Sequence, residues 1–184
     1  APPPEFIRGD SGLTPTGLGP TQEELVAAAD NNRDWLYHTH DYSGRRYSGL
    51  KQITRRNADD LQVAFAFQMG EEGTGFQTGP IVYDGVMYVT TLQQTVALDA
   101  ATGRPLWRHE WHPLTKESWK KSRGVAIKDG RVVRGTTDGY LIALDAATGR
   151  LLWARRCADT SIGEALTMPP MIYGDLILIG PAGS

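Results

Sequence analysis

An internal repeat is the feature that most limits how this chain can fold. The octapeptide Ala-Leu-Asp-Ala-Ala-Thr-Gly-Arg occupies residues 97–104 and again residues 143–150, and a tryptophan, Trp107 or Trp153, follows each copy. The two copies are 46 residues apart. Self-similarity at such a period is typical of propellers and solenoids, in which one small structural unit recurs along the chain.

A second element repeats with nearly the same spacing. Residues 81–89, 125–133 and 171–179 each have the pattern of a strand, a two-residue turn and a second strand. An Asp-Gly pair stands at the centre of the first two segments, and Asp-Gly suits a turn in which both central residues have positive φ. The Gly-Asp pair of the third segment suits the related turn in which only the first residue does. The sequence therefore predicts three successive hairpins.

Each period also holds two further strand-like pieces, such as residues 95–99 and 105–107, joined by an Asp-Ala-Ala-Thr-Gly turn. Four strands in about 45 residues make one propeller blade. The aspartate of the turn can accept hydrogen bonds from amides further along the turn, and its glycine can adopt a left-handed conformation. The repeated motif is thus turn chemistry rather than an active site, and the tryptophan after it is expected to pack against the neighbouring blade.

The flanking segments differ from the repeats. Residues 1–20 are rich in proline and glycine and poor in large apolar side chains, which predicts an extended arm. Thr21 stands three residues before Glu24, a capping-box arrangement that predicts a short helix over about 21–30. A second helical turn is expected at 57–61, where Asn57 can act as the N-cap. We expect an all-β propeller portion over residues 21–184, with three to four blades of four antiparallel strands.

Composition excludes several functions. The formal net charge of the 184 residues is −2, so the chain lacks the basic surface that nucleic acid or an anionic membrane would attract. No apolar run approaches the roughly 20 residues of a membrane span, and the first residues lack the charged and apolar regions of a signal peptide, which is expected to have been removed. Motifs for nicotinamide or nucleotide binding and for serine esterases are absent.

Several motifs point to one family. They are the segment Asp-Tyr-Ser-Gly-Arg-Arg-Tyr-Ser-Gly-Leu-Lys-Gln-Ile at 41–53, the Asn-x-x-x-Leu turn at 57–61, and the Ala-x-Asp-x-x-Thr-Gly-x-x-x-Trp repeats. From about Asp34 to the last residue, the sequence resembles the N-terminal part of the eight-bladed propeller dehydrogenases that use pyrroloquinoline quinone (PQQ). Phe65 stands where that family usually has a blade tryptophan.

The resemblance implies which residues contact PQQ. Gln77 would meet the rim of the quinone, Arg123 would pair with a carboxylate of this tricarboxylate cofactor, and the Thr167 hydroxyl would face it. A short tract of small residues would line the cofactor beside its metal. The residues alone leave open a surface arginine and an ordinary strand threonine. The cofactor residues implied are Gln77, Arg123, Thr167, Ala182, Gly183 and Ser184.

The sequence departs from the family at one loop. Many relatives have adjacent cysteines that form a ring disulfide over the cofactor, and Glu117 and Ser118 stand there instead, with Trp119 as a candidate for stacking. The family's metal ligands and catalytic base are expected beyond residue 184, so no catalytic or metal-binding residue is assigned in this chain. The pair His38 and His40 has a spacing that a metal could use, but no third ligand is near in sequence, which favours solvated or hydrogen-bonded histidines.

The implied function is oxidation of an alcohol by hydride transfer to PQQ, with calcium or a lanthanide as Lewis acid and a cytochrome c as electron acceptor, in the periplasm. The rest of the propeller would come from the same or a partner chain, without which these residues are expected to be inactive. A noncatalytic propeller that serves as a protein-binding scaffold in the bacterial envelope is the alternative.

Overall fold

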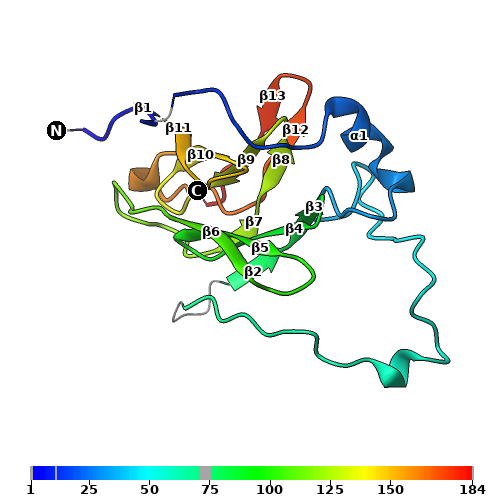
Figure 1. The fold of residues 1–184 in the computed structure, drawn as a ribbon. Coiled ribbons are helices and arrows are strands. Elements are labelled where there is room, and N and C mark those ends of the chain that lie inside the picture. Colours follow the sequence, from blue (N-terminus) through cyan, green and yellow to red (C-terminus); the bar gives the residue numbers. More distant parts are fainter. Residues whose placement is uncertain (1, 11, 71–75, 184) are drawn as a thin grey trace.

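Two four-stranded antiparallel units dominate the structure, a computed structural model that describes residues 2–10, 12–70 and 76–183. The first sheet has the order β3-β4-β5-β6, and the second has the order β8-β9-β10-β11 with β1 added outside β11 (Figure 1). The strands are β1 (Phe6–Arg8), β2 (Phe76–Gly79), β3 (Ile81–Tyr83), β4 (Val86–Thr90), β5 (Gln94–Asp99), β6 (Pro105–Glu110), β7 (Ser122–Gly124), β8 (Ala126–Lys128), β9 (Arg131–Gly135), β10 (Tyr140–Asp145), β11 (Leu151–Arg156), β12 (Met171–Tyr173) and β13 (Leu176–Leu178). The helical elements are α1 (Gln22–Val26) and the 3₁₀ turns η1 (Ala27–Asp30), η2 (Ala58–Asp60) and η3 (Thr160–Ile162).

The three predicted hairpins are confirmed. They are β3-β4, β8-β9 and β12-β13, each an antiparallel pair. Asp84 and Asp129 have φ of 46°, and the glycine after each also has positive φ, as the predicted turn requires. Of the three to four blades expected, two are complete in the described residues, and the hairpin β12-β13 represents a third.

Where the first blade meets the second, the ring of Trp107 packs against Gly149. The ring of Trp107, at the outer strand β6, covers Gly149 so closely that a methyl group on this glycine would lie 2.4 Å from Cε3 of the tryptophan. The indole Nε1 donates to the backbone oxygen of Ala146 at 2.9 Å. Phe65 covers Gly103 in the same way, at 2.3 Å from the corresponding methyl position. Phe65 therefore takes the role in packing that the repeat assigns to tryptophan.

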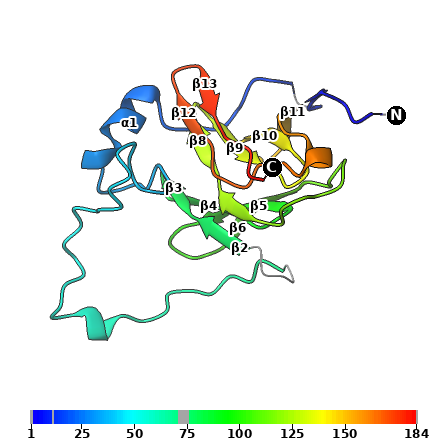
Figure 2. The ribbon, with the colours of Figure 1, turned by 180° about the vertical axis from the view of Figure 1, so that it is seen from behind.

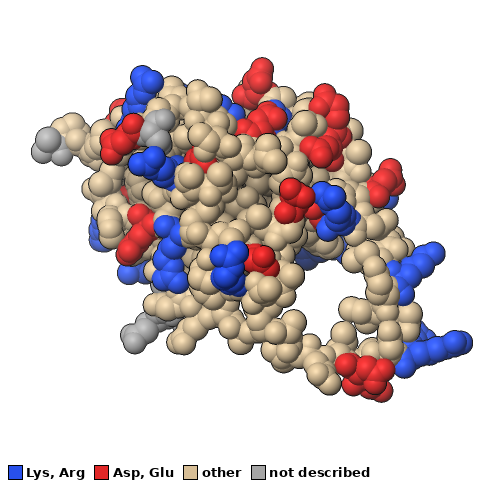
Figure 3. All heavy atoms as spheres, viewed as in Figure 1, with Lys and Arg blue, Asp and Glu red and all other residues tan. Residues whose placement is uncertain are grey.

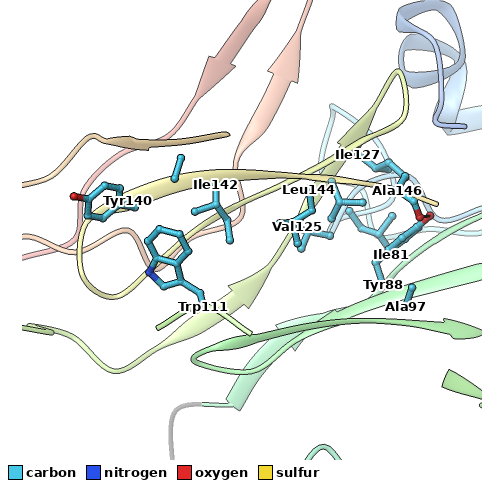
Figure 4. Packing of buried hydrophobic residues seen from close by; sticks show 12 residues of the cluster. Ile81, Tyr88, Ala97, Trp111, Val125, Ile127, Tyr140, Ile142, Leu144 and Ala146 are labelled. Atoms are coloured by element: carbon cyan, nitrogen blue, oxygen red, sulfur yellow. Dashed lines mark hydrogen bonds between the residues drawn. The ribbon is translucent and has the colours of Figure 1, made fainter. Parts of the chain in front are cut away.

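The main hydrophobic core lies between the two blades (Figure 4). Ile81 and Tyr88 of the first blade face Ile127, Ile142 and Leu144 of the second, and all five are at most 3% exposed. Burial of such side chains is the largest favourable contribution to folding, at roughly 25 cal/mol for each Å² of apolar surface removed from water. The blades are thus held together mainly by apolar packing.

The N-terminal arm runs along the edge of the second blade. Strand β1 pairs antiparallel with β11, and both the amide and the hydroxyl of Thr16 donate to the carboxylate of Asp145. The helix that follows begins as the sequence predicts, because the Thr21 hydroxyl accepts from the Glu24 amide and the Glu24 carboxylate accepts from the Thr21 amide. The helix is short, since α1 passes into η1 after five residues.

The segment after the helix connects the innermost strands of the first and third hairpins. Trp35 forms an isolated bridge with Val82 of β3. The hydroxyls of Tyr37 and Tyr42 both donate to the backbone oxygen of Ile172 in β12, at 3.3 and 2.5 Å. This segment therefore ties together blades that are distant in sequence.

Residues 50–64 are all exposed and extend away from the blades as a long loop with η2 at its far end (Figure 2). The helical turn predicted at 57–61 is present as η2, and Asn57 is its N-cap residue as predicted, but the Asn57 side chain makes no capping hydrogen bond. The Asn57 side chain turns back instead, accepting from the Thr54 amide at 2.7 Å and donating to the Gln52 backbone oxygen at 2.8 Å. An asparagine side chain can bond to nearby backbone groups instead of capping a helix, and the geometry of the loop decides which bond forms.

Acidic and basic side chains are interspersed on the face shown in Figure 3. Among the described residues, no helix has the length and apolar character needed to cross a bilayer.

Candidate functional site

The residues just before the three hairpins are brought to one place. Strand β2 pairs in parallel with β7, with Phe76 opposite Ser122 and Gly79 opposite Gly124. Gln77 and Arg123 are therefore on adjacent strands, and both residues are exposed.

Thr167 joins this pair through a direct contact. The Nη1 of Arg123 donates to the hydroxyl oxygen of Thr167 at 2.6 Å, across 44 residues of sequence. Thr167 is buried whereas Arg123 is exposed, so the threonine fixes one side of the guanidinium. A guanidinium held in this way is preorganised to pair with a carboxylate.

A chain of hydrogen-bonded hydroxyl groups connects β2 and β7 to β4. The Thr90 hydroxyl, on β4, lies 3.1 Å from the Thr78 hydroxyl and 2.9 Å from that of Ser122. Thr90 is fully buried, and Ser122 is 4% exposed. These contacts join β2, β4 and β7 immediately beside Gln77 and Arg123, which limits movement of either backbone.

The small-residue tract closes another side of the site. Ala182 pairs with Ala165 through two backbone hydrogen bonds of 2.9 and 2.7 Å, so it lies close to the backbone that carries Thr167. Gly183 has φ of 92°, and a methyl group on it would lie 2.3 Å from the Gly163 oxygen. Only glycine fits this position. Ser184, which the resemblance also implies, lies outside the described residues.

The loop in which relatives have the ring disulfide is held by hydrogen bonds. The Ser118 hydroxyl donates to the Thr160 backbone oxygen at 3.0 Å, and the Glu117 carboxylate accepts from the Thr137 hydroxyl. Lys120 lies 3.7 Å from the same carboxylate. Polar side chains therefore fix this loop onto the second blade.

Asp138 anchors the start of that loop, and sequence reasoning missed it. Its buried carboxylate accepts from the Trp111 indole at 3.0 Å and from the Leu114 amide at 2.7 Å. Its backbone oxygen accepts from the Thr115 hydroxyl at 3.0 Å. No local pattern marks Asp138 as the anchor of this loop, because the Trp111 and Leu114 donors are more than 20 residues away.

The two histidines weighed as a metal pair have different surroundings. His40 is buried, with its Nε2 3.2 Å from the Asn31 backbone oxygen and its ring 4.6 Å from the ring of Trp35. Burial, together with the positive charge of Arg46, lowers the pKa of His38. In the part of the chain that the structure describes, no group of three His, Cys, Asp or Glu residues is arranged to hold a metal ion.

Known proteins are similar to this chain in sequence. Residues 35–159 match the family described as glucose/ethanol/alcohol dehydrogenase, β-propeller domain. The dehydrogenase subunit of alcohol dehydrogenase (quinone) from Acetobacter aceti is 36% identical over 180 residues, which are 91% of this chain and 24% of the relative. The 1-butanol dehydrogenase (cytochrome c) of Thauera butanivorans is 36% identical over 159 residues, which are 82% of this chain and 23% of the relative.

Solved structures agree. A quinohemoprotein alcohol dehydrogenase of Pseudomonas putida superimposes with a TM-score of 0.80 and 30% identity, over 92% of this chain and 25% of the other. A europium-containing methanol dehydrogenase gives the same TM-score and identity, over 88% of this chain and 29% of the other. These structures confirm the predicted propeller fold.

The chain spans about a quarter of the length of these relatives. The family match nevertheless covers the blades and reaches from the segment after the helix to the end of the second blade. The chain therefore belongs to the PQQ β-propeller family of glucose, ethanol and alcohol dehydrogenases.

Proposed function

We propose that the protein to which this chain belongs is a quinoprotein dehydrogenase that oxidises an alcohol, and that the described residues bind one side of PQQ. The observation that carries the proposal is the contact between Arg123 and Thr167, with Gln77 on the adjacent strand. Three positions from three successive hairpins thus converge on one mouth, which is how a propeller builds a site for a single small ligand.

The chemistry of these groups fits PQQ. An exposed guanidinium supported by a buried hydroxyl suits a planar carboxylate, because two parallel N–H groups can meet the two carboxylate oxygens. With the arginine donating to its oxygen, the Thr167 hydroxyl keeps its own hydrogen to donate to a ligand. The Gly183 backbone allows close approach of the chain beside them.

The part of this chain in the reaction is binding and orientation. PQQ would supply the two-electron acceptor for the hydride of the alcohol. Arg123 would hold the cofactor's charge, Thr167 would orient Arg123, and Gln77 would donate from its amide at the rim. The proton acceptor is assigned to no described residue.

The remaining parts of the proposal rest on the relatives. The europium in the methanol dehydrogenase supports a lanthanide as the metal, with calcium as the other candidate, and the cytochrome named for the butanol enzyme supports a cytochrome c acceptor. We further propose that the protein is periplasmic and that the rest of the propeller comes from the same or a partner chain.

Cofactor uptake by the full-length protein tests the proposal. Purified protein is dialysed against PQQ with calcium or a lanthanide, and bound PQQ and alcohol-dependent dye reduction are measured. Arg123→Ala is expected to weaken PQQ binding about 10- to 100-fold, the range for a lost hydrogen bond to a charged group. Arg108→Ala, which removes an exposed arginine from β6, is the matched control and should bind as the wild type does. No uptake by the wild type would refute the enzyme and favour a noncatalytic scaffold.

A further inference from the structure

Trp119 is a large aromatic side chain left open to solvent. It is 52% exposed, whereas Trp111, eight residues earlier, is 6% exposed and hydrogen-bonded. Exposing an indole ring forgoes much of the stabilisation that burial gives. One edge of the ring packs against Gly183, since a methyl group on this glycine would lie 2.6 Å from the indole Nε1.

This ring stands beside the Arg123–Thr167 pair. Trp119 precedes Arg123 by four residues in the same connection to β7. Its contact, Gly183, follows Ala182, whose bridge to Ala165 is two residues from Thr167. Gly183, the Ala182–Ala165 bridge and Thr167 thus link the indole to the Arg123 guanidinium through short contacts.

The loop that carries the ring is ordered before any ligand arrives. Its start is anchored through Leu114 and Thr115 to Asp138, and its middle through Ser118 to Thr160. The single cysteine of the chain is not in this loop. A loop that is already ordered loses less conformational entropy when a ligand binds, so more of the stacking energy appears as affinity.

We propose that Trp119 is a binding residue that stacks on one face of the planar cofactor whose carboxylate pairs with Arg123, an inference that rests on the proposed function. The polar loop around it replaces a covalent clamp. An exposed indole offers a flat π-surface on which a fused aromatic ligand can stack. The edge of the Trp119 ring lies close to the Gly183 backbone.

Three variants of the full-length protein test this role. Trp119→Ala removes the ring, Trp119→Leu keeps apolar bulk without a flat surface, and Trp119→Phe keeps a flat surface. The dissociation constant for PQQ, measured by equilibrium dialysis, is expected to rise about tenfold for Ala, to rise by about the same factor for Leu, and to stay within about threefold for Phe. The Leu variant also guards against a misfolded Ala variant.

Tryptophan fluorescence gives a second readout that does not depend on turnover. PQQ stacked on Trp119 should quench its emission, so the quenched fraction should fall in Trp119→Phe and persist in the control Trp153→Phe, on the outer strand β11. If the wild type binds PQQ but the Ala and Leu variants bind equally well, the inference is overturned and the proposed function stands. If the wild type takes up no PQQ, both are overturned.

Discussion

Replacing Asp138 by alanine should destabilise the second blade and loosen the loop over the site. The fully buried carboxylate accepts from the Trp111 indole, the Leu114 amide and the Thr136 hydroxyl. In the Ala variant the Thr136 hydroxyl keeps a partner, since it also lies 3.0 Å from the Tyr140 backbone oxygen. The Trp111 indole and the Leu114 amide lose this acceptor.

The magnitude follows from these two orphaned donors. A buried donor left without an acceptor costs about 1–3 kcal/mol. Trp111 is 6% exposed, so its donor carries close to the full cost, whereas Leu114 is 46% exposed and water can reach its amide more readily. We therefore expect the free energy of unfolding to fall by about 2–4 kcal/mol. Asp138→Asn keeps one acceptor and should lose roughly half as much.

Urea unfolding of the full-length protein, followed by tryptophan emission, measures the change. Asp59→Ala, in the exposed turn η2, is the control and should unfold like the wild type. PQQ affinity should also fall in Asp138→Ala, because the segment that carries Trp119 begins at this anchor. An unfolding free energy within about 0.5 kcal/mol of the wild type would refute the reasoning, since it would mean that the two donors find other partners.

Three further predictions concern the site and the blades. Thr167→Val leaves the Arg123 guanidinium unsupported and should weaken PQQ binding up to about tenfold by equilibrium dialysis, with Thr167→Ser near the wild type; equal affinities for Val and Ser would contradict the role of the hydroxyl. Gly149→Ala combines a left-handed φ of 71° with overlap with the Trp107 ring and should lower the free energy of unfolding by about 2–4 kcal/mol in urea; a loss under about 1 kcal/mol would show that the ring moves aside. Burial lowers the pKa of His109, so the folded state disfavours its proton and stability should fall as pH drops below the ordinary histidine value; His109→Gln should flatten this slope in unfolding measured across pH, and an unchanged slope would contradict it.

Local chemistry made much of the fold predictable. The Asp-Gly pairs predicted hairpin turns whose positive φ values the structure bears out at Asp84 and Asp129. The capping box at Thr21 is equally local. The resemblance implied that Gln77, Arg123 and Thr167 share one ligand, and the structure places Gln77 on the strand beside Arg123, whose side chain reaches Thr167.

What could not be predicted depends on contacts between distant segments. The distant partners of Asp138 and Thr90 cannot be predicted from the residues next to them in sequence. Composition likewise gave no sign that the arm pairs with β11: glycines such as Gly17 and Gly19 read as signs of an unstructured segment, yet methyl groups on them would lie 2.4 Å from the backbone nitrogens of Ala147 and Gly130. At these two positions glycine allows close backbone contact with the second blade and does not mark a flexible segment.

The seating of Trp107 on Gly149, and of Phe65 on Gly103, has a consequence for how such enzymes diversify. These contacts fix the angular step between neighbouring units at the periphery, far from the axis. Glu117 and Ser118, in the loop near the cofactor residues, take no part in these aromatic contacts. A lineage can exchange a thiol pair for Glu117 and Ser118, or alter what faces the ligand, while the radial geometry is inherited unchanged.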